Sequence, residues 1–225
     1  MTITTAIFDA YGTLFDVNAA ARNAAAQPDA GDWADRWPEI SENWRRKQLE
    51  YSWLRVVGGV HCDFWQVTQD GLDWALEAAG LIEPNLRARL LALYRELDAY
   101  PEAAAVLKAL KTRGIATAIL SNGSPDMLDS AVTSAKLGPL LDAVLSVEDV
   151  GVFKPDVRVY DMVGTRFGCT ADQVLFVSSN GWDASGAAHY GFRTAWVNRA
   201  GAPVDRLYGT PHHILRDLSQ IPDLI

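Results

Sequence analysis

The chain has 225 residues, of which 49% are hydrophobic and 21% charged, which is ordinary for one globular domain or for a core with an inserted subdomain. The formal net charge of −8 argues against nucleic acid as a partner, because binding to phosphates requires a basic surface. No apolar run approaches the roughly 20 residues that span a bilayer, so we expect no membrane partner either.

The first predicted element is a strand over residues 2–8, a short apolar and β-branched run that ends at Asp9. A glycine-containing turn, residues 11–14, follows it directly. A strand that delivers an acid to such a turn is typical of the carboxyl edge of a parallel α/β sheet. Next in the chain, residues 19–26 are rich in alanine and predict a helix or a loop.

The segment over residues 16–98 has a different character. Most of the chain's tryptophans lie in it, between Trp33 and Trp74. Apolar spacing near 3.6 predicts helices over residues 37–57, 64–80 and 84–97, and no segment has the spacing of a strand. We therefore expect residues 16–98 to form a helical cap subdomain.

After Pro101 the predicted strands and helices alternate along the chain. The expected helices cover residues 101–112, 126–135, 156–167 and 183–190, and the expected strands cover residues 115–120, 143–147, 174–177 and 193–197. Such alternation predicts βαβ units and a parallel sheet, which the first strand joins only if residues 16–98 are an insertion. The prediction is an α/β fold with a Rossmann-like parallel sheet core (residues 1–15 and 99–225), helices on both faces, and an inserted helical cap subdomain (residues 16–98).

The two cysteines and the start of the chain bear on the cellular compartment. Cys62 and Cys169 lie far apart and in no metal-binding spacing. Reduced thiols in a cytoplasmic protein are the simplest interpretation. Residues 1–6 contain no basic segment ahead of an apolar run, so we expect no signal peptide.

Polar clusters follow several predicted strands, at residues 9–13, 121–123, 154–156 and 178–183. The ends of parallel strands converge at the crevice where open α/β sheets bind ligands. Each cluster alone is a weak signal, because residues 9–13 could be a turn with a helix cap and residues 121–123 an ordinary loop. Together and in this order they predict one site.

With these clusters the sequence resembles the haloacid dehalogenase superfamily, which has a nucleophilic Asp loop, a Ser or Thr after the second strand, a Lys and an acidic loop. The resemblance covers nearly the whole chain. Phosphatases of the superfamily carry a second Asp where this chain has Tyr11, and paired Mg²⁺-binding acids where residues 178–182 are neutral and only Asp183 is acidic. The chain is instead similar to the (S)-2-haloacid dehalogenases (type II L-2-haloacid dehalogenases), which implies that it needs no metal and no cofactor.

The resemblance also implies an activity, the hydrolytic dehalogenation of small (S)-2-haloalkanoic acids to (R)-2-hydroxyalkanoic acids. Asp9 would attack C2 in line, displace the halide with inversion, and form an aspartyl ester that water hydrolyses. The implied partners are a small anionic 2-haloacid, the halide product and a second copy of the chain in a homodimer. Two alternatives stay open, a phosphatase with a degenerate site and a binding protein that keeps the fold without catalysis.

The resemblance assigns catalytic roles to Asp9, Thr13, Arg45, Ser121, Lys154, Tyr160, Ser178, Asn180 and Asp183. Arg45 would reach the departing halide from the cap; the family often has Gln directly after this residue, where the chain has Arg46. Lys154 would orient Asp9, and Asp183 would position the hydrolytic water together with Asn180 and Ser178. Structural alternatives remain, since Lys154 could lie on the surface, Thr13 and Asp183 could cap helices, and Tyr160 could be a core residue.

The implied substrate-binding residues are Ala10, Tyr11, Arg45, Leu49, Phe64, Ser121, Asn122 and Trp182. Ser121 and the backbone N–H groups of residues 10, 11 and 122 would hold the substrate carboxylate, and Asn122 could also contact the halide. An apolar wall around C2 and the alkyl tail would exclude bulk water; it would be formed by Tyr11, Leu49, Phe64 and Trp182. Phe64 could equally be a core residue, and Ser121 an ordinary loop residue.

Overall fold

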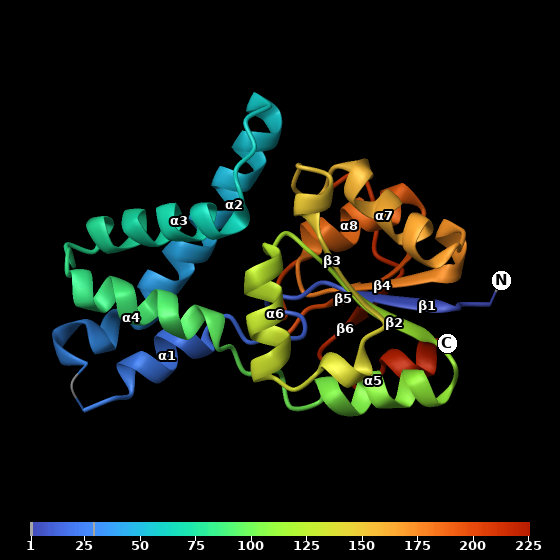
Figure 1. Ribbon diagram of the computed structural model, residues 1–225, viewed down its shortest axis with the longest axis horizontal. Helices are drawn as coiled ribbons and strands as arrows, with labels where there is room; N and C mark the ends of the chain where they lie inside the picture. The colour runs from blue at the N-terminus through green and yellow to red at the C-terminus, as the bar shows by residue number, and fades with distance from the viewer. Residues whose placement is uncertain (1, 29) are drawn as a thin grey trace.

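A parallel sheet of six strands forms the centre of the fold (Figure 1), a computed structural model that describes residues 2–28 and 30–225. The strands are β1 (Thr5–Phe8), β2 (Ala116–Ser121), β3 (Ala143–Ser146), β4 (Val174–Ser178), β5 (Arg193–Val197) and β6 (His213–Leu215), in the order β3-β2-β1-β4-β5-β6. All residues of β1 are buried, because it pairs with β2 on one side and β4 on the other. Its apolar, β-branched sequence suits a strand that is covered on both faces.

Four helices connect the strands: α5 (Ala103–Thr112), α6 (Pro125–Ser134), α7 (Val157–Phe167) and α8 (Gly181–Tyr190). Crossovers between parallel strands are right-handed, which places α5 and α6 on one face of the sheet and α7 and α8 on the other. Figure 1 shows α7 and α8 on the side of the sheet opposite to α5. The predicted Rossmann-like α/β fold with helices on both faces is therefore confirmed.

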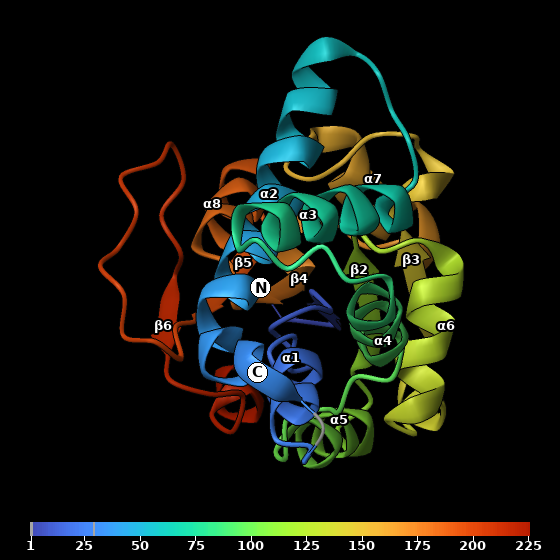
Figure 2. The same ribbon diagram turned by 90° about the vertical axis from the view of Figure 1, so that its left-hand side faces the viewer.

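The chain between β1 and α5 forms α1 (Ala19–Ala25), α2 (Trp37–Gly58), α3 (Phe64–Ala78) and α4 (Pro84–Arg95), which we call the cap. The cap lies at the carboxyl ends of the strands, and Figure 2 views the molecule from that side. Trp44 Nε1 donates to the carbonyl oxygen of Thr68 at 2.8 Å, which joins α2 to α3. These helices approach closely at Gly71, where a Cβ atom would lie 3.2 Å from the backbone nitrogen of Gln48.

The chain enters and leaves the cap at neighbouring points. Phe15 pairs with Ala99 in an antiparallel bridge. The N–H of Asp16 donates to the carbonyl oxygen of Asp98 at 2.9 Å. This pairing supports a boundary near residues 15–16 and 98–99, and the division into a core (residues 1–15 and 99–225) and a cap (residues 16–98) remains our proposal.

The predicted elements differ from the observed ones mainly at their ends. β6 was not predicted, because it has only three residues and one of them is exposed. The first strand begins at Thr5 and not at residue 2, and α8 begins at Gly181, before the predicted residue 183. The alanine-rich segment over residues 19–26 was predicted as a helix or a loop, and it forms the helix α1. Within residues 2–28 and 30–225, no helix is long and apolar enough to cross a membrane.

Candidate active site

The carboxyl edge of the sheet brings the predicted polar clusters together. Phe8, the last residue of β1, pairs in register with Ile119 of β2 and Val177 of β4. Asp9 therefore follows β1 at the level of Ser178, which ends β4, and one residue before the level of Ser121, which ends β2. Residues far apart in the sequence meet here because parallel neighbouring strands end at one edge.

The carboxylate of Asp9 is held through both of its oxygens. Oδ1 lies 3.2 Å from Nζ of Lys154. Oδ2 accepts hydrogen bonds from Thr13 Oγ1 at 3.0 Å and from Asn180 Nδ2 at 2.9 Å. The side chain keeps only 9% exposure. Bonds from a cation and two neutral donors fix the orientation of this carboxylate at the edge of the sheet.

Lys154 is fully buried and lies between two carboxylates, with Nζ 3.2 Å from Asp9 and 2.9 Å from Oδ2 of Asp183. Burial alone would lower the pKa of Lys154. The negative charges of Asp183 and Asp9 together outweigh burial and raise that pKa above its ordinary value. Lys154 is therefore a buried ammonium ion, and the alternative of a surface lysine is wrong.

Asp183 is the second partner of Lys154. Its Oδ1 accepts a hydrogen bond from Tyr160 Oη at 2.9 Å. Burial raises the pKa of Asp183, although the charge of Lys154 acts in the opposite direction. Burial also raises the pKa of Tyr160 well above its ordinary value, so that its hydroxyl remains a donor.

Two alternatives for these residues are decided by the structure. The N-cap of α8 is Asn180, so Asp183 is not the capping residue of that helix. Tyr160 is both a core residue, with no exposed side chain, and a polar contact, because it reaches Asp183 and not Asp9. Asp183 and Tyr160 thus form a buried pair behind Lys154.

Arg45 reaches the core from α2. Its Nη2 donates to Oδ1 of Asn180 at 2.6 Å, and the amide nitrogen of Asn180 donates to Asp9. The turn after Asp9 leaves room for this guanidinium because Gly12 has no side chain: a Cβ there would lie 3.4 Å from Arg45 Nη2 and 2.9 Å from Ser179 Oγ. Gly12 also has a φ of 86°, in the left-handed region that favours glycine.

Thr13 connects the turn after Asp9 to the end of β4. In addition to Asp9, its Oγ1 contacts the backbone N–H of Ser179 at 2.8 Å. The nearest following helix begins at Ala19, so Thr13 does not cap a helix and that alternative is wrong. Ser178 Oγ accepts from the N–H of Asn180 at 3.1 Å, which fixes the turn that carries Asn180.

A cavity of about 30 Å³ lies in front of Asp9, between the core and the cap. The predicted residues that line it are Asp9, Tyr11, Arg45, Leu49, Phe64, Ser121, Asn122, Lys154, Asn180 and Trp182. The predicted residues that do not line it are Ala10, Thr13, Tyr160, Ser178 and Asp183. The structure thus separates a set that faces the cavity from a set that supports it from behind.

The loop after β2 offers donors to this cavity. Ser121 Oγ accepts from the backbone N–H of Gly123 at 3.1 Å, which leaves its hydroxyl proton available. Asn122 Oδ1 accepts from the backbone N–H of Lys154 at 2.9 Å, which leaves its amide N–H groups available. Both side chains are buried, and their fixed acceptors orient the remaining donors.

The apolar wall is assembled from the core and the cap. Tyr11 stacks on Tyr94 with 5.7 Å between ring centroids, and its centroid lies 6.5 Å from that of Phe64. Trp182 meets Trp53 of α2 edge to face at 5.4 Å. Burial raises the pKa of Tyr11 well above its ordinary value. Tyr11 is therefore unable to serve as the ionisable group that the phosphatases have at this position.

Gln48 and Tyr94 also line the cavity and were not predicted. Gln48 Nε2 donates to Thr68 Oγ1 at 2.8 Å and to Tyr94 Oη at 3.3 Å. Gln48 lies three residues after Arg45, so helical spacing alone could have placed it on the same face. Tyr94 comes from α4 and has no comparable local signal.

Ser179 was also missed, although it stands inside the predicted cluster 178–183 and contacts Thr13. Arg46, which follows Arg45 where the family often has Gln, does not line the cavity. Its guanidinium contacts Glu50 and Asn43 and lies over the ring of Trp74 at 5.0 Å. The departure from the family at this position therefore faces away from the cavity.

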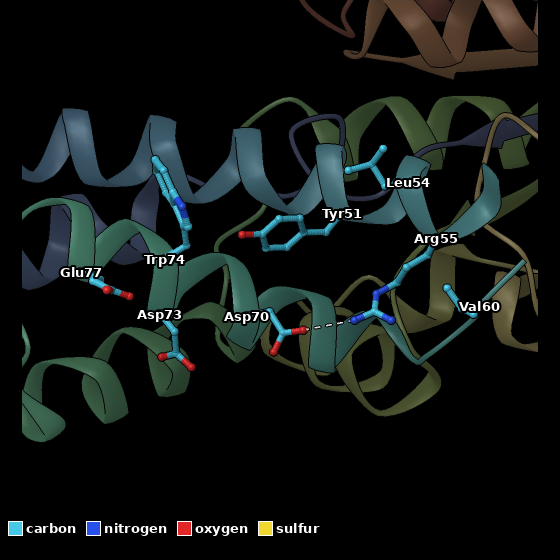
Figure 3. Close-up of a pocket in the computed structure, with 8 residues that line it drawn as sticks. All are labelled: Tyr51, Leu54, Arg55, Val60, Asp70, Asp73, Trp74 and Glu77. Carbon is cyan, nitrogen blue, oxygen red and sulfur yellow. Dashed lines mark hydrogen bonds and ion pairs between the residues drawn. The ribbon is translucent and has the colours of Figure 1, made fainter. Parts of the chain in front are cut away.

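A much larger hollow, of about 590 Å³, lies on the cap between α2 and α3 (Figure 3). None of the predicted site residues lines it. Its most evident polar contact is the ion pair between Arg55 and Asp70, 3.4 Å apart. The size of a hollow alone does not identify the active site here, because the polar groups converge at the small cavity in front of Asp9 and not at this hollow.

Metal ligands do not gather at the site. Over the part of the chain that the structure describes, no group of three or more His, Cys, Asp and Glu side chains could hold a metal ion. The two site carboxylates, Asp9 and Asp183, share the ammonium group of Lys154. This donor set does not fit a magnesium ion, which prefers several oxygen ligands around one position. The expectation of a site without metal or cofactor stays a prediction.

Comparison with known proteins identifies the family. The family model of the haloacid dehalogenase-like hydrolases matches residues 3–191. This chain belongs to that family. The (S)-2-haloacid dehalogenase 1 of Pseudomonas sp. (strain CBS-3) is 46% identical over 220 residues, which cover 97% of this chain and 95% of the relative. The (S)-2-haloacid dehalogenase 4A of Burkholderia cepacia is 41% identical, with 97% and 93% covered.

Solved structures agree. The L-2-haloacid dehalogenase of Xanthobacter autotrophicus, solved with chloropropionic acid covalently bound, has a TM-score of 0.87 and 38% identity, and the match covers 99% of this chain and 98% of that one. A crystal structure described as a dehalogenase has a TM-score of 0.92 and 41% identity, with 99% and 97% covered. The predicted superfamily and its (S)-2-haloacid dehalogenase branch are confirmed.

Proposed function

We propose that this chain hydrolyses small (S)-2-haloalkanoic acids to (R)-2-hydroxyalkanoic acids through an aspartyl ester on Asp9. The predicted enzyme class, a hydrolase acting on carbon–halide bonds, is confirmed by the relatives. The observation that carries the substrate and mechanism is the carboxylate of Asp9, held by Lys154, Thr13 and Asn180 at a cavity that Arg45 reaches from the cap. The relative with covalently bound chloropropionic acid supports an ester intermediate.

In the first step, a carboxylate oxygen of Asp9 attacks C2 while the carbon–halogen electron pair leaves with the halide. The available N–H and O–H donors of Ser121 and Asn122 hold the substrate carboxylate, and the guanidinium of Arg45 meets the departing anion. Halide leaves without protonation, so a neutral Tyr11 is no obstacle at the position of the phosphatase acid. The apolar wall keeps bulk water away from C2 during displacement.

In the second step, water attacks the carbonyl carbon of the ester. The proton of that water reaches Asp183 through Lys154, because Asp183 lies behind Lys154 and does not line the cavity. Burial raises the pKa of Asp183, which favours proton uptake. Asn180 and Ser178 fix the turn beside the ester. As the ester bond breaks, the proton held by Asp183 returns to the leaving alkoxide oxygen and the hydroxy acid is released. The second proton of the water passes to solvent, which leaves Asp9 as a carboxylate.

The decisive assay is halide release from each enantiomer of 2-chloropropionate in the presence of a metal chelator. Chloride release from the (S) enantiomer, with (R)-lactate as product, is expected. No release from either enantiomer, together with Mg²⁺-dependent cleavage of phosphate esters, would establish the phosphatase alternative.

A second experiment tests the intermediate. One turnover in ¹⁸O-labelled water with enzyme in excess should place the label on the carboxylate of Asp9 and not on the hydroxy acid. Label found directly in the hydroxy acid would mean that water attacks C2 and that Asp9 is not the nucleophile.

We also propose that the chain forms a homodimer. The last turns of α2 and the residue beyond them expose apolar side chains, namely Leu54 at 59%, Val57 at 86% and Val60 at 59%. Large apolar side chains exposed close together in the sequence favour association. A cytoplasmic location and the absence of nucleic-acid and membrane partners stay predictions from composition.

A further inference from the structure

Glu148 belongs to the α/β core and contacts the cap in the segment that connects α2 to α3, at His61 and Phe64. It belongs to the short 3-10 helix Val147–Asp149, which directly follows β3. Its Oε1 accepts the backbone N–H of Phe64 at 3.3 Å, and its Oε2 lies 2.9 Å from Nε2 of His61. One carboxylate of the core thus holds two points of the connection between α2 and α3.

The contact with Phe64 is made at the start of α3. Phe64 is the first residue of that helix, so its N–H has no partner within the helix. Asp63 caps the helix and accepts from the N–H of Gln66 at 2.9 Å. Glu148 satisfies a different free N–H group, and its negative charge is favoured at a helix N-terminus. The bond therefore fixes where α3 begins relative to the core.

The side chain of Phe64 lines the cavity in front of Asp9. Its ring centroid lies 5.8 Å from that of Phe153, in an edge contact, and 6.5 Å from that of Tyr11. The ring of His61 packs on Phe153 at 4.7 Å. Both contacts of Glu148 thus end at groups that determine where the ring of Phe64 lies in the cavity wall.

Glu148 is itself anchored to the loop after β2. Its backbone N–H donates to Ser146 Oγ at 3.2 Å, and Ser146 Oγ donates to the carbonyl oxygen of Gly123 at 2.7 Å. Gly123 follows Ser121 and Asn122, whose donors face the cavity. Hydrogen bonds through Ser146 and Glu148 therefore connect the loop of Ser121 and Asn122 to Phe64 in the apolar wall of the cavity.

We propose that Glu148 is a positioning residue that sets the chain-length selectivity of the enzyme by holding Phe64 against the alkyl tail of the substrate. Glu148 itself does not line the cavity and acts through Phe64. This inference rests on the proposed function, because the alkyl tail belongs to the 2-haloacid.

The test is the ratio of kcat/KM for (S)-2-chlorobutanoate to that for (S)-2-chloropropionate. Glu148→Ala should shift the ratio toward the longer acid by about tenfold, the low end of what one methylene is worth in a hydrophobic pocket. KM should change more than kcat, since no group at the reacting atoms is altered. Glu148→Gln keeps an oxygen that can accept the N–H of Phe64, so it should retain a ratio within about twofold of wild type.

Two further variants separate this role from a general loss of structure. Asp149→Ala removes the exposed neighbouring carboxylate and should keep the wild-type ratio. The double variant of Glu148→Ala with Phe64→Ala should have the ratio of Phe64→Ala alone, because the first change acts only through the second residue. If Glu148→Ala does not fold, Glu148→Asp, which withdraws the carboxylate by one methylene, should give the same direction of shift.

An unchanged ratio in the folded Glu148 variants, or additive shifts in the double variant, would overturn the inference while leaving the proposed function intact. Absence of halide release from either acid by the wild-type protein would instead remove the proposed function itself.

Discussion

At the scale of single residues, the arrangement of Lys154 is the most informative feature of the site. A fully buried ammonium group needs compensation, and here it contacts the carboxylates of both Asp9 and Asp183. Removing Lys154 would leave two buried acids beside one another without a cation. The same contacts orient Asp9, the proposed nucleophile, so the stability and the proposed chemistry of the site depend on one side chain.

The pH dependence of the first step follows from this arrangement. Because the two carboxylates raise the pKa of Lys154 above its ordinary value of 10.5, the ammonium form should persist in the folded enzyme to higher pH than in the unfolded chain. Its contribution to stability is fully present below that ordinary value and is lost as pH rises through the higher folded value. The halide burst in rapid-mixing experiments should therefore show no alkaline decline below about pH 10. A decline with a midpoint near pH 8 would mean that burial, and not the carboxylates, controls Lys154.

Asp183 should act mainly in the second step. In Asp183→Asn, Lys154 keeps Asp9 as its partner, so ester formation should continue while ester hydrolysis slows by about 10²- to 10⁴-fold. The measurements are a burst of one halide per enzyme without further turnover, and a protein mass increased by the acyl group. Loss of the burst as well would show that Asp183 is needed to place Lys154 and Asp9 for the first attack.

At the scale of elements, α2 carries different functions on its different faces. Arg45, Gln48 and Leu49 lie on one face by helical spacing and line the cavity. Arg46 and Lys47 lie outside it, paired with Glu50 and stacked on Trp74. The order of residues along one helix thus separates the side chains that line the cavity from the charged side chains of the surface.

Gln48 should matter for stability as well as for the cavity. It is 3% exposed and bonds to both Thr68 and Tyr94, so Gln48→Ala would leave the buried hydroxyl of Tyr94 without this partner. We expect a loss of about 1–3 kcal/mol in the free energy of unfolding, measured by urea denaturation. Arg46→Ala on the outer face of α2 is the matched control and should change stability by no more than about 0.5 kcal/mol. Equal losses in the two variants would contradict the importance of the buried network.

The sequence predicts the core elements because their signals are local. An apolar run ending at Asp9 and regular alternation after Pro101 are both visible without knowledge of contacts, and the sheet confirms them. β6 was not predicted because a strand of three residues, one of them exposed, is too short to carry a periodic pattern. The positions of Tyr94 and Glu148 near the cavity were not predicted for another reason. They depend on how α4 and the turn after β3 pack, which no local pattern encodes.

The roles of the site residues depended on the resemblance more than on their spacing. Strand ends alone predict that Asp9, Ser121 and Asn180 come together, and the structure places them around one cavity. Spacing could not predict that Arg45 crosses from the cap to Asn180, since more than a hundred residues separate them. It also could not predict that Lys154 is shared, because that depends on the burial of α8 against the sheet.

At the scale of the whole molecule, the cavity is lined by residues of both the cap and the core. Contacts across this junction include Arg45 with Asn180, Trp53 with Trp182, and the bonds of Glu148. In the proposed mechanism the core supplies the nucleophile, Asp9, and the cap supplies Arg45, the group that meets the halide. Substitutions in the cap or in the core at this junction should therefore both alter activity.

The oligomeric state provides a test at this scale. Light scattering should give a particle mass of twice the 24.6 kDa of one chain. Val57→Glu places a charge on the most exposed apolar position of α2 and should weaken dimerisation at least about tenfold. Val144→Glu changes a valine of the edge strand β3 with 42% exposure and serves as the control. A wild-type protein that remains monomeric at micromolar concentration would exclude the dimer.

The position of Lys154 between Asp9 and Asp183 also has a consequence for the order of events in a turnover. At rest the three groups carry one surplus negative charge, and in the proposed mechanism that surplus disappears when Asp9 becomes a neutral ester. Asp183 is then the single anionic partner of Lys154. The proposed proton acceptor of the second step therefore no longer shares the ammonium group with Asp9 once the first step is complete. When hydrolysis restores the charge of Asp9, the carboxylate of the newly formed hydroxy acid faces a like charge again. We expect this repulsion to help expel the product. The recovery of the negative charge on Asp9 would then contribute to product release.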